Sequence, residues 1–361
     1  MENYSSKKIA VIDPSSYSLP YDYFYINELK NTFHVDFYFS KSACNYEYVE
    51  KLKLCDNVTL HEYSISPSCT NPLFGLINYV KMLKDIFLKR KNYKKIHFIW
   101  SIFFLFESLF FLLIKDKLIF TFHNDVPHSY KRKIFWPFKI IMKLASKIVF
   151  VSNYTMSTFI KNYGVHPNYQ LVQHGIMPIE TLKNNKFDEN INVEKTLLFW
   201  GRIEDYKGVD IFANFIIDFP VEIYGKWSPQ LISLKNKLSR MKGIYINDSY
   251  LPFDELSTML SREVVFILPY KDATQSGVLY TLLAYGKVFI SSDVGENSDF
   301  LIKHGLGQLV FDRKEKESMK NAINYAFNEY NEIKFKLLQI KEEYEWDKIM
   351  NSKKLYKLYG S

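Results

Sequence analysis

The sequence predicts an α/β protein built from two doubly wound domains, and three observations lead to this expectation. The chain has 361 residues, which suits two domains of about 150 to 200 residues better than one. Short apolar runs alternate with longer helical stretches, a pattern typical of parallel sheets covered by helices on both faces. A polar segment near the middle interrupts the alternation, which then begins again.

The first domain is expected at 1–178. Its candidate strands are 8–12, 34–39, 57–63, 95–100, 117–122, 147–151 and 170–172, and its helical stretches include 23–30, 73–90 and 103–113. The loop at 13–22, after the first strand, lacks the Gly-x-Gly-x-x-Gly pattern of dinucleotide-binding folds. NAD and FAD are therefore disfavoured.

The second domain is expected at 195–340, after a polar linker at 179–194. Its candidate strands are 195–200, 221–224, 244–247, 264–268, 288–291 and 307–310. The ending at 314–358 is predicted to form two or three charged amphipathic helices. The last of these, within 341–361, is expected as a C-terminal helix that can cross back to the first domain.

The net charge of +8 belongs entirely to the first half of the chain. Residues 1–180 carry 22 Lys and Arg against 14 Asp and Glu, whereas residues 181–361 carry 25 of each sign. This asymmetry indicates an anionic partner, either a phospholipid surface or a nucleic acid. Because no familiar nucleic-acid motif is present, we do not expect nucleic-acid binding.

Three basic stretches bear on this partner, at 81–95, 131–133 and 139–147. The last two flank the bulky apolar residues 134–138, a composition typical of helices that lie in the bilayer interface. One such stretch alone is equally typical of a solvated basic face. Three in one half favour an anionic membrane surface as partner.

Apolar runs and cysteines indicate the compartment. The longest apolar run, 102–114, is interrupted by Glu107 and Ser108 and is shorter than the roughly 20 residues of a membrane span. The first residues lack a charged-then-apolar leader. The cysteines are Cys44, Cys55 and Cys69. They fit a reducing compartment because their number is odd and their spacing is not that of a pair. We therefore expect a cytoplasmic protein, peripheral on the inner face of the cytoplasmic membrane.

The sharpest local signal lies at 199–208, where a candidate strand runs into Gly201-Arg202 and Lys207-Gly208 follows at a helix start. Ligands bind outside the carboxyl ends of parallel strands, and Arg forks onto phosphate oxygens. The spacing favours a diphosphate-binding turn over a loop with two solvated cations.

A second signal lies at 268–279, where a strand is followed by a small polar turn and an apolar helix at 278–285. The backbone N–H groups and the positive dipole end of a helix start make an anion site. Taken alone, the pattern is more typical of an ordinary Ser-Gly helix cap.

Together the two segments closely resemble the donor half of GT-B glycosyltransferases of the family 4 type, or glycosyltransferase group 1. The resemblance rests on Gly-Arg-x4-Lys-Gly, Pro-Tyr-x4-Gln-Ser-Gly and the run 284–295, and it covers 195–310. It implies a GT-B fold, in which two Rossmann-like domains face a central cleft, and a hexosyltransferase that uses a nucleotide-sugar co-substrate. Arg202 and Lys207 would then grip the donor diphosphate. The other candidate donor contacts are Gly201, Asp272, Thr274, Gln275, Ser276, Gly277, Val278 and Thr281.

One departure concerns a Glu-x7-Glu motif that contacts the donor sugar and ribose in many members of this family. Ala273 and Thr281 stand at the two positions. Asp272 and Gln275 are the neighbouring candidates to replace these contacts. Because the sequence has no Asp-x-Asp and no metal-ligand cluster, we expect no metal and no other cofactor.

A looser resemblance in the first half concerns 121–128, which is similar to the His-Asn-x-x-Pro-His segment of exopolysaccharide transferases, including xanthan-type mannosyltransferases. His123 follows a strand and is expected at its carboxyl end, facing the cleft that the fold implies. The candidate catalytic residues are His123, Asn124, Asp125 and Asp22, and the candidate acceptor contacts are Tyr21 and His128. The competing interpretation is that His123 and Asn124 only form hydrogen bonds within their loop. In the same interpretation, the two carboxylates are solvated or cap helices.

These features lead to one functional hypothesis and two alternatives. The hypothesis is transfer of a sugar from a GDP- or UDP-sugar to a lipid-linked saccharide, in the synthesis of capsule, exopolysaccharide or O-antigen. Inversion of the anomeric centre would require a base such as Asp125 or Asp22, and retention would not. The alternatives are a sugar-nucleotide 2-epimerase of the same fold and a catalytically silent, membrane-associated scaffold.

Overall fold

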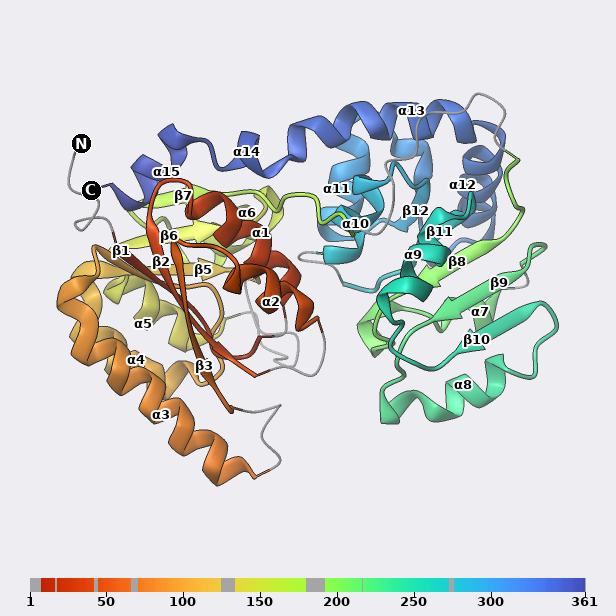
Figure 1. The fold of residues 1–361 in the computed structure, drawn as a ribbon. Helices are drawn as coiled ribbons and strands as arrows, with labels where there is room; N and C mark the ends of the chain where they lie inside the picture. Colours follow the sequence, from red (N-terminus) through yellow and green to blue (C-terminus); the bar gives the residue numbers. More distant parts are fainter. Residues whose placement is uncertain are drawn as a thin grey trace. The chain divides into compact units, whose positions relative to one another are not determined.

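The chain forms two compact units in the computed structural model (Figure 1), which describes residues 8–16, 18–41, 45–65, 71–124, 134–179, 192–215, 217–272 and 276–360. Unit 1 comprises Met1–Gly175 and Trp346–Ser361, and unit 2 comprises Ile176–Glu345. The chain thus leaves unit 1 once and returns to it for its last helices. The sequence places these divisions at 178 and 341, and most of its expected linker lies outside the described residues.

Unit 1 is built on a parallel seven-stranded sheet in the order β3-β2-β1-β4-β5-β6-β7. Its strands are β1 (Lys8–Asp13), β2 (His34–Ser40), β3 (Val58–Tyr63), β4 (Lys95–Phe98), β5 (Leu118–Phe122), β6 (Lys147–Phe150) and β7 (Tyr169–Leu171). All seven were expected, with small shifts at their ends. The strand order reverses between β1 and β4, and such switch points are where open α/β sheets bind ligands.

The helices of unit 1 are α1 (Leu19–Leu29), α2 (Glu47–Lys53), α3 (Pro72–Lys89), α4 (Phe104–Ile114), α5 (Trp136–Leu144), α6 (Asn153–Tyr163), α14 (Trp346–Ile349) and α15 (Ser352–Tyr359). One continuous core joins the sheet to α3, α4, α5 and α6, and aromatic side chains such as Tyr79, Phe111, Phe138 and Phe159 fill it. Rings of this size bury large areas and pack edge to face, which favours the rigid sheet that a site needs.

The expected start of the first helix is wrong. The pattern predicts a helix from 23, but α1 begins at Leu19 because Pro20 occupies its first turn, where the fixed φ of proline suits a helix. Tyr21 and Asp22 therefore lie inside α1 rather than in a loop. Both side chains are buried, which changes what they can do.

A buried polar network attaches the C-terminal helix α15 to unit 1. The hydroxyl of Tyr359 lies 2.7 Å from that of Tyr25 on α1 and 2.6 Å from Nδ1 of His97 on β4. His97 Nε2 is in turn 2.7 Å from Thr121 Oγ1 on β5. Burial lowers the pKa of His97 to about 3, so this ring is neutral and serves as a structural connector.

Unit 2 is built on a parallel six-stranded sheet in the order β10-β9-β8-β11-β12-β13. Its strands are β8 (Leu197–Trp200), β9 (Val221–Tyr224), β10 (Ile244–Asn247), β11 (Val265–Leu268), β12 (Phe289–Ser292) and β13 (Val310–Phe311). Its helices are α7 (Ile211–Asn214), α8 (Ile232–Leu238), α9 (Phe253–Ser261), α10 (Gly277–Ala284), α11 (Gly295–Lys303), α12 (Lys316–Asn328) and α13 (Tyr330–Lys341). The switch point here lies between β8 and β11.

Two expectations for the end of the chain need correction. A strand was expected at 307–310, but residues Gly307–Leu309 form a 3₁₀ turn and β13 begins only after it. The chain reverses at Gly305, whose φ is 65°, and a 3.0 Å hydrogen bond from Leu309 N–H to Leu306 O closes the turn. Two or three helices were expected at 314–358, and the structure has four there, α12 to α15. The extended backbone of Glu345 and the Asn351 cap of α15 divide them.

Candidate active site

Two glycines bring the carboxyl ends of β8 and β9 close together. Gly201 and Gly225 follow these strands with φ values of 137° and 147°. A Cβ on Gly225 would lie 1.8 Å from the carbonyl oxygen of Gly201, so a larger residue does not fit there. A Cβ on Gly201 would lie 3.5 Å from Val278 Cγ2 at the start of α10. The two sequence motifs therefore meet at one edge of the sheet.

Lys207 ends a 3₁₀ turn (Asp205–Lys207) and is buried against aromatic rings. Its ammonium nitrogen lies 3.8 Å from the centroid of the Tyr270 ring and 5.2 Å from that of Tyr206. Burial lowers its pKa to about 8, and the nearby Arg202 acts in the same direction. A partly desolvated cation of this kind interacts strongly with an anion that reaches it.

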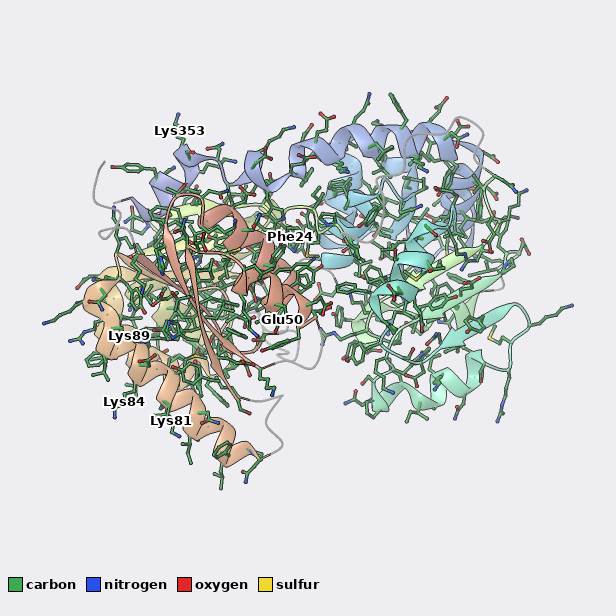
Figure 2. The ribbon with its side chains drawn as sticks, in the orientation of Figure 1. Phe24, Glu50, Lys81, Lys84, Lys89 and Lys353 are labelled. Atoms are coloured by element: carbon green, nitrogen blue, oxygen red, sulfur yellow. The ribbon has the colours of Figure 1, made fainter. Side chains whose placement is uncertain are left out.

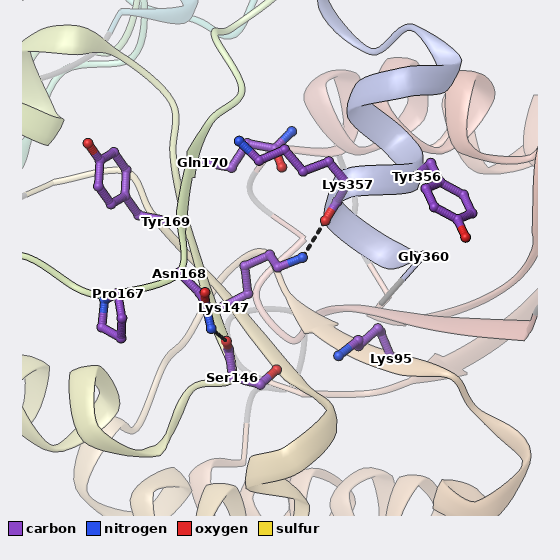
Figure 3. A pocket seen from close by; sticks show the side chains of 10 residues that line it. All are labelled: Lys95, Ser146, Lys147, Pro167, Asn168, Tyr169, Gln170, Tyr356, Lys357 and Gly360. Carbon is purple, nitrogen blue, oxygen red and sulfur yellow. Dashed lines mark hydrogen bonds between the residues drawn. The ribbon is translucent and has the colours of Figure 1, made fainter.

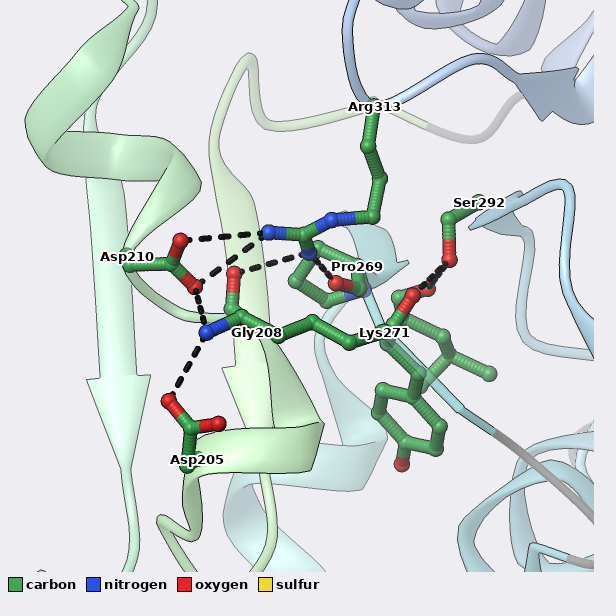
Figure 4. A network of polar contacts seen from close by, with 9 residues as sticks. Asp205, Gly208, Asp210, Pro269, Lys271, Ser292 and Arg313 are labelled. Carbon is green, nitrogen blue, oxygen red and sulfur yellow. Dashed lines mark hydrogen bonds and ion pairs between the residues drawn. The ribbon is translucent and has the colours of Figure 1, made fainter. Parts of the chain in front are cut away.

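Gly208 and Arg313 hold the Lys207 turn against the end of β11, as Figure 4 shows. Gly208 adopts φ 71°, and a Cβ there would lie 1.9 Å from Pro269 O. The Arg313 guanidinium donates to the carbonyl oxygens of Gly208 and Pro269 and to the Asp210 carboxylate. The turn is thereby fixed in place before any ligand arrives.

Lys271 adds a further link in this network. Its ammonium lies 2.8 Å from Asp205 Oδ1 and 3.2 Å from Asp210 Oδ1, and its backbone N–H donates to Tyr206 O at 2.7 Å. Arg313 was not identified from the sequence, and Tyr270 and Lys271 were recognised only as part of the Pro-Tyr-x4-Gln-Ser-Gly segment, without a role of their own. Arg313 lies in an ordinary charged segment, and only the tertiary fold shows its role.

Ser276 precedes α10, and its side chain makes no capping hydrogen bond to the helix. Its hydroxyl instead lies 3.3 Å from the Tyr270 hydroxyl. The Ser276 side chain therefore does not cap the first backbone N–H groups of α10, which are those of Gly277 and Val278. Helix starts of this kind bind phosphate through N–H groups and the helix dipole.

The remaining candidate donor contacts are placed less favourably or lie outside the described residues. The Thr281 hydroxyl is buried and donates to Gly277 O of its own helix at 3.1 Å. Asp272 is exposed in the turn before α10, and Arg202 is exposed directly after Gly201. Thr274 and Gln275, with Ala273, lie outside the described residues.

In unit 1, His123 lies directly after β5, as expected, but its ring is buried. It stacks on Trp100 with centroids 3.7 Å apart, and its Nε2 lies 3.1 Å from Ile99 O. Tyr21 contacts His123 edge to face at 5.5 Å and lies 4.9 Å from His174. These rings form a packed aromatic cluster at the carboxyl edge of the sheet. Asn124 follows at this edge, and Asp125 and His128 lie outside the described residues.

Asp22 and Asp13 form a buried carboxyl pair at the carboxyl end of β1. Asp13 accepts hydrogen bonds from Ser15 N–H and Ser15 Oγ at 2.9 and 2.7 Å. Burial, and then the proximity of Asp13, raise the pKa of Asp22 well above its ordinary value. The raised pKa favours the protonated form of Asp22, and in this form it is not a ready base.

A cavity of about 760 Å³ lies elsewhere on unit 1 (Figure 3). Lys95 and Lys147, the first residues of β4 and β6, line it together with Lys357 of α15. Lys147 donates to the carbonyl oxygens of Lys357 and Leu358 at the end of that helix. The cavity thus lies at the amino ends of the strands, opposite the edge where α/β sheets bind substrates.

Comparison with known proteins agrees with this geometry. Residues 194–329 match the family model described as Glycosyl transferases group 1. An uncharacterized glycosyltransferase of Methanocaldococcus jannaschii is 23% identical over 257 residues, which are 66% of this chain and 64% of that protein. This chain thus matches less than two thirds of the length of that relative.

Two solved structures share the fold over nearly the whole chain. Anabaena HepE in complex with UDP-glucose superimposes with a TM-score of 0.74 at 13% identity and covers 98% of this chain and 100% of its own. WaaG, a glycosyltransferase involved in lipopolysaccharide biosynthesis, gives a TM-score of 0.65 at 12% identity with the same coverage.

The fold is that of the GT-B glycosyltransferases. More particularly, residues 194–329 in its second half match the group 1 glycosyltransferase model. The resemblance to xanthan-type transferases in the first half stays a prediction.

Proposed function

We propose that this protein transfers a hexose from a nucleoside diphosphate donor to a lipid-linked saccharide at an anionic membrane surface, in the synthesis of a surface polysaccharide. The observation that carries the proposal is the buried Lys207 ammonium beside Tyr270, next to the start of α10. The structures of HepE in complex with UDP and with UDP-glucose support a nucleotide-sugar donor by analogy of fold.

Charge stabilisation is the chemistry that this edge of unit 2 supplies. As the bond from the sugar to the diphosphate breaks, negative charge develops on the leaving diphosphate. Lys207, Arg202 and the N–H groups at Gly277 and Val278 would stabilise that charge, and preorganised groups of this kind contribute about 10²-fold to 10³-fold each. No step of this account uses a metal, and a chelator control in the assay tests that prediction.

On the acceptor side, His123, Asn124 and Tyr21 are the proposed contacts. The raised pKa of Asp22 makes it a poor base in the free protein, so an inverting reaction would rely on Asp125. Whether the anomeric configuration inverts is tested by product stereochemistry and by Asp125→Ala. Turnover that survives this substitution removes Asp125 from the mechanism.

Membrane association is proposed through the apolar surface of α3 and α4, which we call the α3–α4 face. Glu107, which interrupts the apolar run, points inward on α4, where it is fully buried and accepts hydrogen bonds from Tyr79, Ser101 and Ile102 N–H. The outer side of α4 is therefore free of charge. Its exposed large apolar side chains, with those of α3, are Leu73, Phe74, Leu76, Ile77, Val80, Leu88, Leu105, Phe106, Leu109, Leu112 and Leu113.

Cations border this face and favour an anionic lipid surface as its occupant. Lys81 and Lys84 are exposed on α3 beside the apolar residues (Figure 2), and Lys139 and Lys143 are exposed on α5, which packs against α4. Each cation near an anionic leaflet contributes about 1 kcal/mol. No helix among the described residues is long and apolar enough to cross a membrane, so the proposal is a peripheral attachment, on the cytoplasmic face.

The donor assignment is tested by thermal shift and slow hydrolysis with GDP-sugars and UDP-sugars, with and without a chelator. We expect one donor to stabilise the protein and to be hydrolysed slowly, with both effects lost in Arg202→Ala and Lys207→Ala. A protein that responds to no nucleotide sugar, but still supports polysaccharide assembly, would instead be the silent scaffold.

The membrane assignment is tested by flotation with vesicles that contain anionic or only zwitterionic lipid. Leu109→Glu with Leu112→Glu should abolish binding to anionic vesicles. The matched control is Ile232→Glu with Ile302→Glu, which places the same charges on exposed apolar positions of unit 2. Equal binding by both double variants would exclude the α3–α4 face as the contact.

A further inference from the structure

Glu296 and Asn297 lie in the first turn of α11, directly after β12, and sequence analysis did not identify either. The helix begins at Gly295, whose φ of 56° turns the chain from the strand edge. Glu296 is 7% exposed and Asn297 is 0% exposed. Two polar side chains are thus enclosed at the same edge of the sheet as Lys207.

These side chains carry hydrogen-bonding atoms that have no partner among the described residues. Glu296 Oε2 and both Asn297 side-chain atoms, Oδ1 and Nδ2, are buried without a partner. Buried polar atoms are nearly always hydrogen-bonded, because an unpaired one costs roughly 1–3 kcal/mol. Three such atoms on adjacent residues therefore point to a ligand that completes them.

One hydrogen bond connects Glu296 to the first turn of α10, at whose start the diphosphate is proposed to bind. The hydroxyl of Tyr280, in the first turn of α10, donates to Glu296 Oε1 at 2.6 Å. Glu296 thus borders the start of α10, where the N–H groups of Gly277 and Val278 are placed. A donor whose diphosphate bound at that helix start would bring its hydroxyl groups close to Glu296.

The chemistry of the pair selects neutral, hydroxyl-rich ligands. Burial raises the pKa of Glu296 to about 8, so at neutral pH its carboxyl is mostly uncharged and both donates and accepts. The Asn297 carboxamide likewise offers donors and an acceptor. Such a pair of donors and acceptors can bind two adjacent hydroxyl groups.

We infer that Glu296 and Asn297 bind vicinal hydroxyl groups of the donor, in place of the two Glu side chains that are absent at Ala273 and Thr281. The inference rests on the proposed function. In this role the two residues determine specificity for a neutral hexosyl donor, because they bind hydroxyl groups of either its sugar or its ribose.

The test is isothermal titration of the intact protein with the nucleotide sugar found in the donor screen, its bare nucleoside diphosphate and the 2′-deoxy form of each. Glu296→Leu and Asn297→Leu should each weaken nucleotide-sugar binding at least tenfold. Glu296→Gln should retain most of the affinity, because a neutral acid and an amide make similar hydrogen bonds. The matched control is Glu317→Leu, at an exposed position of α12.

The ligands separate the possible outcomes. Loss confined to the nucleotide sugar assigns the pair to the sugar hydroxyls. Loss for both ligands that disappears with their 2′-deoxy forms assigns it to the ribose. Unchanged affinity in a folded Glu296→Leu or Asn297→Leu protein overturns the inference while the proposed function stands. A wild-type protein that binds no nucleotide sugar overturns both.

Discussion

The Lys207 ammonium lies 3.8 Å from the centroid of the Tyr270 ring, and the Tyr270 hydroxyl lies 3.3 Å from Ser276 Oγ. One aromatic side chain thus connects the turn after β8 to the start of α10. The face of the ring stabilises the cation, which contributes up to about 2 kcal/mol when it is desolvated. Its hydroxyl engages the serine that would otherwise cap the helix.

The first prediction concerns Lys207 itself. Lys207→Met should weaken nucleoside diphosphate binding at least tenfold, because the substitution keeps the apolar stem but removes the buried positive charge. Lys316→Met, at an exposed position of α12, is the control and should bind as the wild type does. Isothermal titration measures both, and equal affinities would remove Lys207 from the donor site.

The second prediction follows from the pKa of about 8 at Lys207. The ammonium form is fully present well below pH 8 and disappears as the pH rises through that value, some two units earlier than for an ordinary lysine. Diphosphate affinity of the wild type should therefore begin to fall near pH 8. In Lys207→Met this fall should be absent, and a fall of the same size in that variant would show that another group is responsible.

The third prediction concerns the backbone of the turn. Gly208→Ala should cost at least about 2 kcal/mol of folding stability, because the new Cβ would lie 1.9 Å from Pro269 O at a positive φ. Gly243→Ala shares the positive φ, at 83°, but has open space around it, so we expect only about 1 kcal/mol. Urea unfolding compares the two, and equal losses would contradict the close packing at Gly208.

The fourth prediction concerns the carboxyl pair of unit 1. Because the pKa of Asp22 is raised on folding, its contribution to stability is fully present below the ordinary pKa and is lost as the pH rises through the folded pKa. Asp22→Asn should therefore lose less stability than the wild type as the pH rises from 5 to 9. Asp116→Asn, at an exposed position, should follow the wild type. Parallel profiles for all three proteins in urea unfolding would exclude a raised pKa at Asp22.

Much of the fold could be predicted because the alternation of apolar and helical stretches is local information. The seven strands of unit 1 and most of those of unit 2 follow from short apolar runs. The beginning of α1 was missed because Pro20 and the polar residues near it are as typical of a loop as of a first turn. The course of 307–310 was missed because the reversal at Gly305 depends on the preceding helix.

The site could be predicted only where a motif spans a few residues. Lys207, Gly208 and the start of α10 were identified from local spacing. Tyr270 and Arg313 act across the tertiary fold, since Arg313 joins two segments more than forty residues away from it in sequence. The burial of His123 and Asp22 likewise arises from neighbours that periodicity does not reveal.

The most direct test of the central claim is titration of the wild type and Lys207→Met with the nucleotide sugar that best stabilises the protein. The account predicts saturable binding and slow hydrolysis of that donor by the wild type, with both lost in the variant. Binding that is equally strong without the Lys207 ammonium, or a wild type that binds no nucleotide sugar, would contradict a donor site at the carboxyl edge of the unit 2 sheet.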